Sequence, residues 1–420
     1  MFTRKNIIIA VVVISIALGV LIRNAAKSRS WAINEINVKN SNASAQNTSV
    51  FGKPKINLPA KIAEGVELLK KSAPIEVEKG LKKGKSVDRR QIALAILDTN
   101  TGAVFEKRYW LNKNELEMYG DSGMVKLEPI DPKNDLIIEV KYWNGYNSFL
   151  DVSNKDGMIV VANKYTLSKT SLGSLIDDKT NDRQDIVYVP YSESLQTKEM
   201  IKAGKRYLTN TVERAMDDLE QRKVVSKAEP DKLVTKVFDK NFIKSIALVE
   251  HIDPSEFYLA DDGGKELVER VLTIIGANKN LAYKYSGSPA GAYGMAQFIE
   301  PTYDAIANAY PEAGLIKDFR QGMADHVNAI KAMYLYFDIH KKEIDVQIAE
   351  KGLTDKKGIE EEMLAATYNG GPGNVLESVR QFGFSWISKQ SELSPSKSIM
   401  KDETLTYVKK FRAVRSLSVF

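Results

Sequence analysis

Hydrophobic and polar positions divide the 420-residue chain into segments of different pattern. An unbroken apolar run, IIIAVVVISIALGVLI, fills residues 7–22, and a stretch rich in Asn, Ser and Ala follows over 31–60. Short β-branched runs separated by turn residues dominate 90–195, whereas helical periodicity dominates from 196 onward. These patterns predict an α+β multidomain chain with a mostly β middle module and an all-helical C-terminal domain.

The apolar run predicts an N-terminal membrane anchor within residues 1–30. No charged residue lies between Lys5 and Arg23, and a helix of that length spans about 26 Å, enough for a bilayer core. A cleaved signal peptide is the alternative, but the only small-residue site nearby is the weak Asn24-Ala25-Ala26. Positive charge on both sides leaves the orientation open. No second long apolar run follows, so the rest of the chain is expected on one side of the membrane.

Residues 31–89 are predicted to be a linker with a short helix, and residues 90–195 a mostly β module of unknown role. Asp98–Gly102 and Asn144-Gly145 separate pairs of apolar stretches, as in hairpins. Several aromatic residues of the module could line a carbohydrate-binding or partner-binding face, or simply form its core. They include Tyr109, Trp110, Tyr142, Trp143 and Tyr146.

The helical pattern predicts a connecting helix within 196–234, ending before Glu229-Pro230-Asp231, and a helical domain over 235–420. In its first segment Glu250 follows an apolar stripe that includes Ile243, Ile246 and Ala247. On a helix these residues share a face, so the carboxyl group points toward an apolar environment that raises the pKa of an acid. The alternative is a helix-end glutamate that merely reaches solvent.

Two glycine-rich stretches follow in the same domain. SPAGAYGMAQ (288–297) has glycines three apart, which permit close backbone approach to a ligand. AATYNGGPG (365–373) ends a helix and places Tyr368 and Asn369 at the turn. Each stretch alone is equally compatible with an ordinary loop or helix end.

Composition narrows the chemistry. The chain has no cysteine and three histidines without an HExxH pairing, so disulfides, thiolate sites and a histidine zinc site are not expected, and no metal or cofactor is predicted. The net charge is +6, of which residues 1–30 contribute +5. The balance elsewhere is close to neutral, and no nucleic-acid partner is expected.

Taken together and in this order, the motifs resemble the catalytic domain of the soluble lytic transglycosylase family, whose fold is similar to goose-type lysozyme. The pattern is a glutamate closing an apolar helix, then S-x-x-G-A-x-G-x-x-Q, then A-x-Y-N-x-G-x-G; near the end, ETLTYV (403–408) resembles the family's E-T-x-x-Y-V element. The resemblance covers roughly 238–412 and implies a lysozyme-like C-terminal fold.

Carried onto this chain, the resemblance implies specific roles. Glu250 would be the single acid/base, and Tyr368 would lie beside it and orient the reacting sugar. The residues that would line or build the glycan cleft are Ser288, Met295, Gln297, Asn369, Glu403 and Tyr407.

The chain departs from the family pattern in two places. The step of 41 residues from Glu250 to Gly291 is about twice the usual one, so either 258–284 is an insertion or the acid is Glu256, Glu266 or Glu269. Met295 stands where leucine is usual.

The resemblance implies a membrane-anchored peptidoglycan lytic transglycosylase. It would cleave the β-1,4 bond between N-acetylmuramic acid and N-acetylglucosamine with formation of a 1,6-anhydro ring, without a cofactor. That function requires the N-terminus inside and the body in the periplasm or another extracytoplasmic cell-wall space. A lysozyme-like hydrolase on the same fold and a non-catalytic wall-binding scaffold are the alternatives. Peptidoglycan strands are the expected partner, and the β module could bind an envelope protein.

Overall fold

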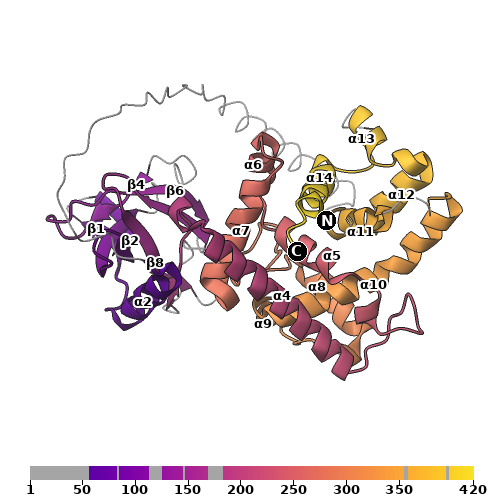
Figure 1. Cartoon of the computed structure of the whole chain (residues 1–420), viewed down its shortest axis with the longest axis horizontal. Helices are drawn as coiled ribbons and strands as arrows, with labels where there is room; N and C mark the ends of the chain where they lie inside the picture. The colour runs from indigo at the N-terminus through magenta and orange to yellow at the C-terminus, as the bar shows by residue number, and fades with distance from the viewer. Residues whose placement is uncertain are drawn as a thin grey trace, which may run out of the picture. The chain divides into compact units, whose positions relative to one another are not determined.

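The chain combines an antiparallel β module with a mostly helical C-terminal half, as the sequence predicts (Figure 1). The predicted anchor at residues 7–22 lies outside the residues that the structure describes, and no described helix is long and apolar enough to cross a membrane. Residues Lys53–Phe420 form one compact unit. The computed structural model describes residues 56–82, 85–112, 125–144, 147–168, 183–353, 358–393 and 397–420.

The β module has two antiparallel sheets. In the larger sheet the strand order is β5-β3-β2-β8-β9, with β1 also paired to β2, and the smaller sheet has the order β4-β6-β7. Both predicted hairpins form, as β2–β3 and β6–β7. The strands are β1 Val77–Lys82, β2 Lys85–Asp98, β3 Val104–Asn112, β4 Val125–Lys126, β5 Glu128–Pro129, β6 Ile138–Asn144, β7 Asn147–Val152, β8 Met158–Ser168 and β9 Arg183–Tyr188.

The central strand β2 is apolar on both faces because both faces are covered. Ile92 and Leu94 pack in a core with the smaller sheet, whereas Ala93 and Ala95 pack in a core with helix α2 (Leu58–Lys71). Since successive side chains of a strand alternate between faces, burial on both sides requires a continuous apolar run. The module is therefore a helix and two sheets in three layers.

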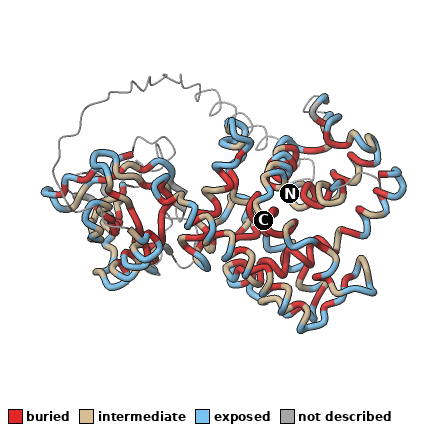
Figure 2. Tube along the Cα trace, viewed as in Figure 1, coloured by how far each residue is buried: buried red, intermediate tan, exposed pale blue. Residues whose placement is uncertain are grey.

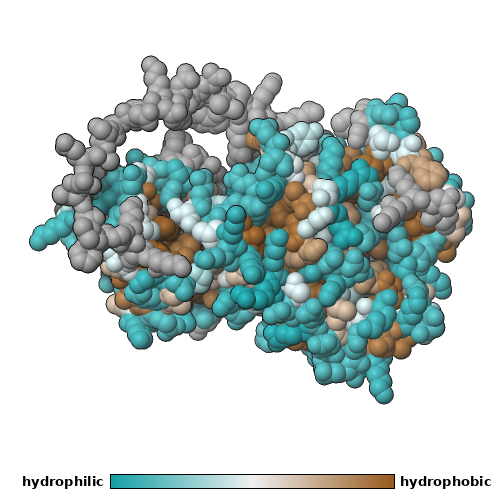
Figure 3. Space-filling view, in the orientation of Figure 1, coloured by the Kyte–Doolittle hydropathy of each residue, from teal (hydrophilic) through white to brown (hydrophobic). Residues whose placement is uncertain are grey.

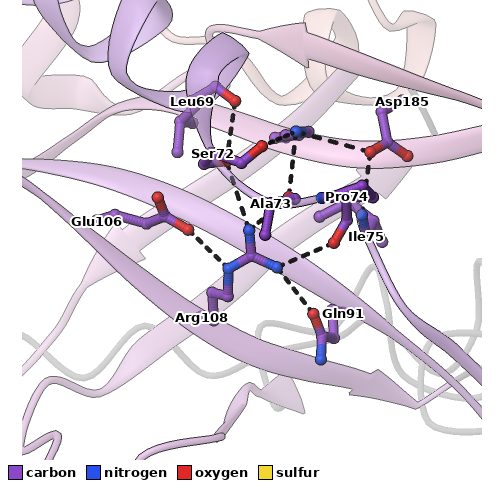
Figure 4. A network of polar contacts seen from close by, with 10 residues as sticks. Leu69, Ser72, Ala73, Pro74, Ile75, Gln91, Glu106, Arg108 and Asp185 are labelled. Atoms are coloured by element: carbon purple, nitrogen blue, oxygen red, sulfur yellow. Dashed lines mark hydrogen bonds and ion pairs between the residues drawn. The ribbon is translucent and has the colours of Figure 1, made fainter.

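Residues 31–89 were predicted to be a linker with a short helix; they contain helix α2, in agreement with that prediction, and also strand β1, which was not predicted. Cationic side chains hold the connection after α2 against the sheet (Figure 4). Arg108 donates to the carbonyl oxygens of Ala73 (2.6 Å) and Pro74 (3.2 Å), and Lys164 donates to that of Ser72 (2.9 Å). These contacts join residues distant in sequence, so local composition gives no sign of them. The strands begin at Val77 rather than at about residue 90.

Most of the C-terminal half packs around helix α10, whose residues 329–337 are almost completely buried. Figure 2 shows buried positions where these helices pack against one another. Figure 3 shows hydrophobic side chains in patches on a largely hydrophilic face of the molecule. The helices are α4 Lys198–Gln221, α5 Lys240–Val249, α6 Pro254–Leu259, α7 Lys265–Asn278, α8 Glu300–Ala309, α9 Phe319–Ala324, α10 His326–Glu350, α11 Ile359–Gly370, α12 Pro372–Phe382, α13 Ser388–Glu392 and α14 Asp402–Ser416.

Helix α7 occupies most of the predicted insertion at 258–284 and packs closely on the connecting helix α4. A Cβ atom at Gly204 would lie 2.0 Å from the backbone oxygen of Leu272, and one at Gly276 would lie 2.3 Å from that of Met200. Glycines therefore permit this contact. Helix α4 ends at Gln221, earlier than the predicted stop near Glu229. Its Met200 packs in a core of the β module, whereas Leu208 and later residues pack in the helical core.

Candidate active site

Glu250 lies directly after helix α5, where the chain turns. Asp239 caps the start of α5 by accepting a hydrogen bond from the backbone N–H of Asn241 (2.8 Å), and the helix ends at Val249. Phe242–Val249 are all buried, so the apolar face predicted from the sequence is confirmed. The C-cap position places the Glu250 side chain at the edge of the helical core rather than within it.

Helix α14 brings two side chains to this carboxyl group. The hydroxyl of Tyr407 donates a hydrogen bond to Oε1 of Glu250 (2.5 Å), and the buried Lys410 donates to the carbonyl oxygens of Val249 (3.0 Å) and Ile252 (2.9 Å). Tyr407 and Lys410 are three apart and so share one face of the helix. Lys410 thus satisfies carbonyl groups at the end of α5 and holds α14 where Tyr407 reaches Glu250.

The environment favours the protonated form of Glu250. Burial raises its pKa from 4.5 to about 7, although the hydrogen bond from Tyr407 and the charge of Lys410 oppose the change; the charge of Glu403 adds to it. A carboxyl group with a pKa near neutral pH can give up a proton and take one back in the same cycle. This is the electrostatic signature expected of a general acid/base.

The S-x-x-G-A-x-G-x-x-Q segment forms a loop held by hydrogen bonds between its own side chains and its backbone. Ser288 Oγ accepts a hydrogen bond from the N–H of Ala292 (3.1 Å). Gly294 has a φ of +71°, and a Cβ there would lie 2.2 Å from the backbone oxygen of Met323. Gln297 also has a positive φ (+51°), and its amide donates to the carbonyl oxygen of Gly294 (2.6 Å). A non-glycine residue in this conformation is strained, and such strain is common at functional sites.

The A-x-Y-N-x-G segment ends helix α11 beside that loop. Tyr368 donates from its hydroxyl to the carbonyl oxygen of Ala296 (2.5 Å), so this side chain holds the loop as well as facing the cavity. Asn369 Oδ1 accepts a hydrogen bond from Thr404 Oγ1 (2.9 Å). The late motif therefore joins the end of α11 to the start of α14.

These segments enclose a cavity of about 820 Å³ with Glu250 in its wall. Tyr336 and His340 of α10 add aromatic rings to it. The predicted site residues that line this cavity are Glu250, Ser288, Gln297, Tyr368, Asn369, Glu403 and Tyr407.

Met295 was predicted to contact substrate, and the structure contradicts this placement. Its side chain is completely buried in the helical core and lines neither cavity beside Glu250. Its backbone oxygen is 2.9 Å from Nε2 of His251. The left-handed turn at Gly294 changes the direction of the chain, so spacing within the motif does not show which side chains face outward.

The alternative glutamates are placed less favourably than Glu250. Glu256 is exposed and forms an ion pair with Arg270 (2.6 Å). Glu266 and Glu269 line neither cavity beside Glu250.

Sequence reasoning missed Lys410, which lines the larger cavity and supports the turn after α5. Its spacing of three residues from Tyr407 on a predicted helix was the available signal.

No group of three or more His, Cys, Asp or Glu side chains that could hold a metal ion occurs among the described residues. A scan against protein-family models finds no matching family, and a search of curated proteins finds no match. The geometry around Glu250 is thus the basis for a functional assignment.

Proposed function

We propose that the chain is a membrane-anchored lytic transglycosylase that cleaves the glycan strands of peptidoglycan. The observation that carries the proposal is the setting of Glu250. A carboxyl group with a pKa near 7 lies in the wall of a large cavity, and residues of the three later motifs line the same cavity. We also propose a lysozyme-like fold for the helical half, which the resemblance of its motifs supports.

In the first chemical step the protonated Glu250 gives its proton to the glycosidic oxygen as the bond to the anomeric carbon breaks. Tyr407 donates to Oε1, and no donor in the described parts of the chain is paired with Oε2. Oε2 is therefore the oxygen available to carry the transferred proton. The N-acetyl carbonyl oxygen of the substrate bonds to the anomeric carbon as the leaving oxygen departs, so no second protein carboxylate is required.

In the second step the ionised Glu250 takes the proton of the sugar's 6-hydroxyl. The oxygen of that hydroxyl bonds to the anomeric carbon as the bond from the N-acetyl carbonyl oxygen breaks, and a 1,6-anhydro ring closes. Each cycle returns the proton to the enzyme, and water is not consumed. A pKa near 7 suits both steps because the two protonation states are similar in free energy. Tyr368 and Gln297 shape the cavity wall that the sugar contacts in this proposal.

A hydrolase on the same site is the second candidate, because one further carboxylate lines the cavity. Glu403 is exposed at the start of α14 and faces the space beside Glu250. A carboxylate in that position could activate water, as in glycosidases that use two carboxyl groups. The mass of the products distinguishes the two reactions.

The proposed function places the body of the chain outside the cytoplasm. Peptidoglycan is met only there, so the apolar run at 7–22 would act as an anchor with the N-terminus inside. The orientation and the retention of the anchor can be tested by protease protection of the full-length chain in cells.

The activity itself is tested with the full-length chain in detergent and purified peptidoglycan. We expect soluble muropeptides to be released by the wild-type chain and not by Glu250→Gln. Folded wild-type protein that binds peptidoglycan without releasing fragments would contradict the proposal and support a scaffold instead.

A further inference from the structure

A second, smaller cavity lies beside Glu250 on the side of the β module. It has a volume of about 280 Å³. It shares four lining residues with the larger cavity: Glu250, Ile252, Pro254 and Gln297. The two cavities therefore meet at the carboxyl group, and a ligand that passes Glu250 from the larger cavity enters the smaller one.

The β6–β7 hairpin supplies one wall of this smaller cavity through Tyr142 and Phe149. These residues are cross-strand partners, so their side chains stand next to each other on one face of the sheet. Tyr142 is 36% exposed, although it belongs to a strand whose Val140 is completely buried.

A β-bulge explains the direction of Tyr142. In a regular strand Tyr142 would point to the same face as Val140, which packs in the core of the module. The register of β6 against β7 shifts between these two residues: Val140 pairs with Leu150, and Tyr142 pairs with Phe149. The extra residue turns Tyr142 away from the core, as bulges next to active sites often do.

The rest of the wall adds hydrogen-bonding groups from the helical half and the ring of Tyr191, which follows β9 and lies 4.8 Å from the ring of Phe149. Arg270 of α7 forms an ion pair with Glu256 of α6 (2.6 Å), and its guanidinium lies 5.3 Å from the ring of Tyr191. All three residues line the cavity. Because Arg270 is already paired with an acid, the wall does not favour an isolated anion. A pyranose ring matches such a site, with apolar C–H faces for the aromatic rings and hydroxyl groups for the polar pair.

We propose that the β6–β7 hairpin provides a saccharide subsite, with Tyr142 as the platform for one sugar ring next to the ring cleaved at Glu250. This inference rests on the proposed function, since it takes the ligand to be the strand that Glu250 cleaves. The β module then contributes to substrate binding, on the opposite side of Glu250 from Tyr368 and Asn369.

The test measures binding separately from cleavage. The full-length chain carrying Glu250→Gln is titrated by calorimetry with the hexamer of β-1,4-linked N-acetylglucosamine. Adding Tyr142→Ala is expected to weaken binding about tenfold, the scale of losing an aromatic contact. Tyr142→Phe keeps the ring and should bind within about twofold of the parent, far less than one aromatic contact is worth.

Tyr258→Ala is the matched control, because Tyr258 is 71% exposed and lines neither cavity. Equal affinities of Tyr142→Ala and Tyr258→Ala would overturn the inference. So would loss of binding in Tyr142→Phe equal to that in Tyr142→Ala, or a dependence on Tyr142 seen only with peptide-bearing muropeptides. Cleavage of peptidoglycan by the wild-type chain decides the proposed function independently, because the hexamer binds or fails to bind without turnover.

Discussion

The two cavities that meet at Glu250 are built in different ways. The larger one is formed mainly by three short sequence segments, 288–302, 367–372 and 403–410, together with α10. The smaller one is lined by the turn 250–254, by one face of α7, by residues of the 283–297 loop region, and by side chains of β6, β7, β9 and the chain after β9. The larger cavity is thus lined by the helical half alone, whereas the smaller cavity is completed by residues of the β module.

This difference shows why motif reading finds one half of a cleft and misses the other. A motif is visible when the residues that make a wall are close in sequence. Tyr142 and Arg270 face the same cavity but are far apart in the chain, and neither lies in a short motif. The sequence analysis named Tyr142 only as one of several aromatic residues that could line a binding face or form the core. The comparison predicts that catalysis depends on the first side and that part of the binding depends on the second.

The largest expected effect on the cleavage rate comes from Glu250, whose carboxyl group lines both cavities. Glu256, which lines only the smaller cavity, is the comparison. Glu250→Gln should lower the rate of muropeptide release by about 10³-fold, within the usual range for a lost general acid. Glu256→Gln, which removes an exposed acid that lines only the smaller cavity, should stay within about tenfold of wild type. Initial rates with purified peptidoglycan measure both. Similar losses in the two variants would contradict the assignment of the acid.

Glu250→Gln should also stabilise the folded chain at high pH. The pKa of Glu250 is raised from 4.5 to about 7 on folding, so between these values the folded state binds the proton more tightly than the unfolded state. The contribution of Glu250 to the free energy of unfolding therefore falls by on the order of 3 kcal/mol as the pH rises from 4.5 to about 7. Above pH 7, Glu250→Gln should unfold at higher denaturant concentration than wild type.

His251 changes the pH dependence of stability in the opposite direction to Glu250. The wild-type chain and Glu250→Gln must therefore be compared with each other at each pH. Burial lowers the pKa of His251 to about 3. This lowered pKa contributes stability that is present above 6.5 and lost as the pH falls through the window down to 3. Both proteins contain His251, and the difference in their unfolding free energies isolates Glu250. A difference that does not change with pH would mean that the carboxyl group is not desolvated.

Tyr407→Phe tests the larger side alone. Loss of the hydrogen bond to Glu250 removes an interaction that lowers its pKa, so the pKa should rise further. Activity that needs the protonated acid falls as the pH rises through this pKa, and the alkaline limb of kcat/KM should therefore move to higher pH. At neutral pH we expect about a tenfold lower rate from lost positioning. Tyr303→Phe, buried in the same core but outside both cavities, should leave the profile in place.

The smallest effect on substrate binding is expected at Met295, whose side chain lines neither cavity. Met295→Leu exchanges two side chains of similar volume in a buried position and should cost less than about 1.5 kcal/mol of stability. KM for soluble glycan fragments should be unchanged, because the side chain does not reach the cleft. A large increase in KM without loss of stability would contradict this account and support the contact between Met295 and substrate that the sequence analysis expected.

Much of the fold could be predicted because its signals are local. The hairpins, the apolar helix before Glu250 and the glycine-rich end of α11 follow from periodicity and turn residues. The placement of α2 against the sheet depends on contacts of Arg108 and Lys164 with residues far away in sequence. The direction of Tyr142 depends on a bulge, which no alternation of apolar and polar residues reveals.

The candidate site shows the same division. Glu250 could be found because it closes an apolar helical pattern, and Tyr407 because it lies in the ETLTYV element (403–408) that resembles the family's motif. Met295 was misplaced because the left-handed residues Gly294 and Gln297 on either side of it change the course of the chain. Lys410 was overlooked because a buried lysine that satisfies the end of another helix has no motif of its own.

The central claim is that Glu250 works alone to close a 1,6-anhydro ring. It is tested most directly by digesting purified peptidoglycan with the full-length chain and weighing the products by mass spectrometry. The account predicts fragments lighter by one water molecule than the products of hydrolysis, and none from Glu250→Gln. Fragments of full hydrolytic mass, formed at a rate that depends on Glu250 and also on Glu403, would contradict it and identify a lysozyme-like hydrolase.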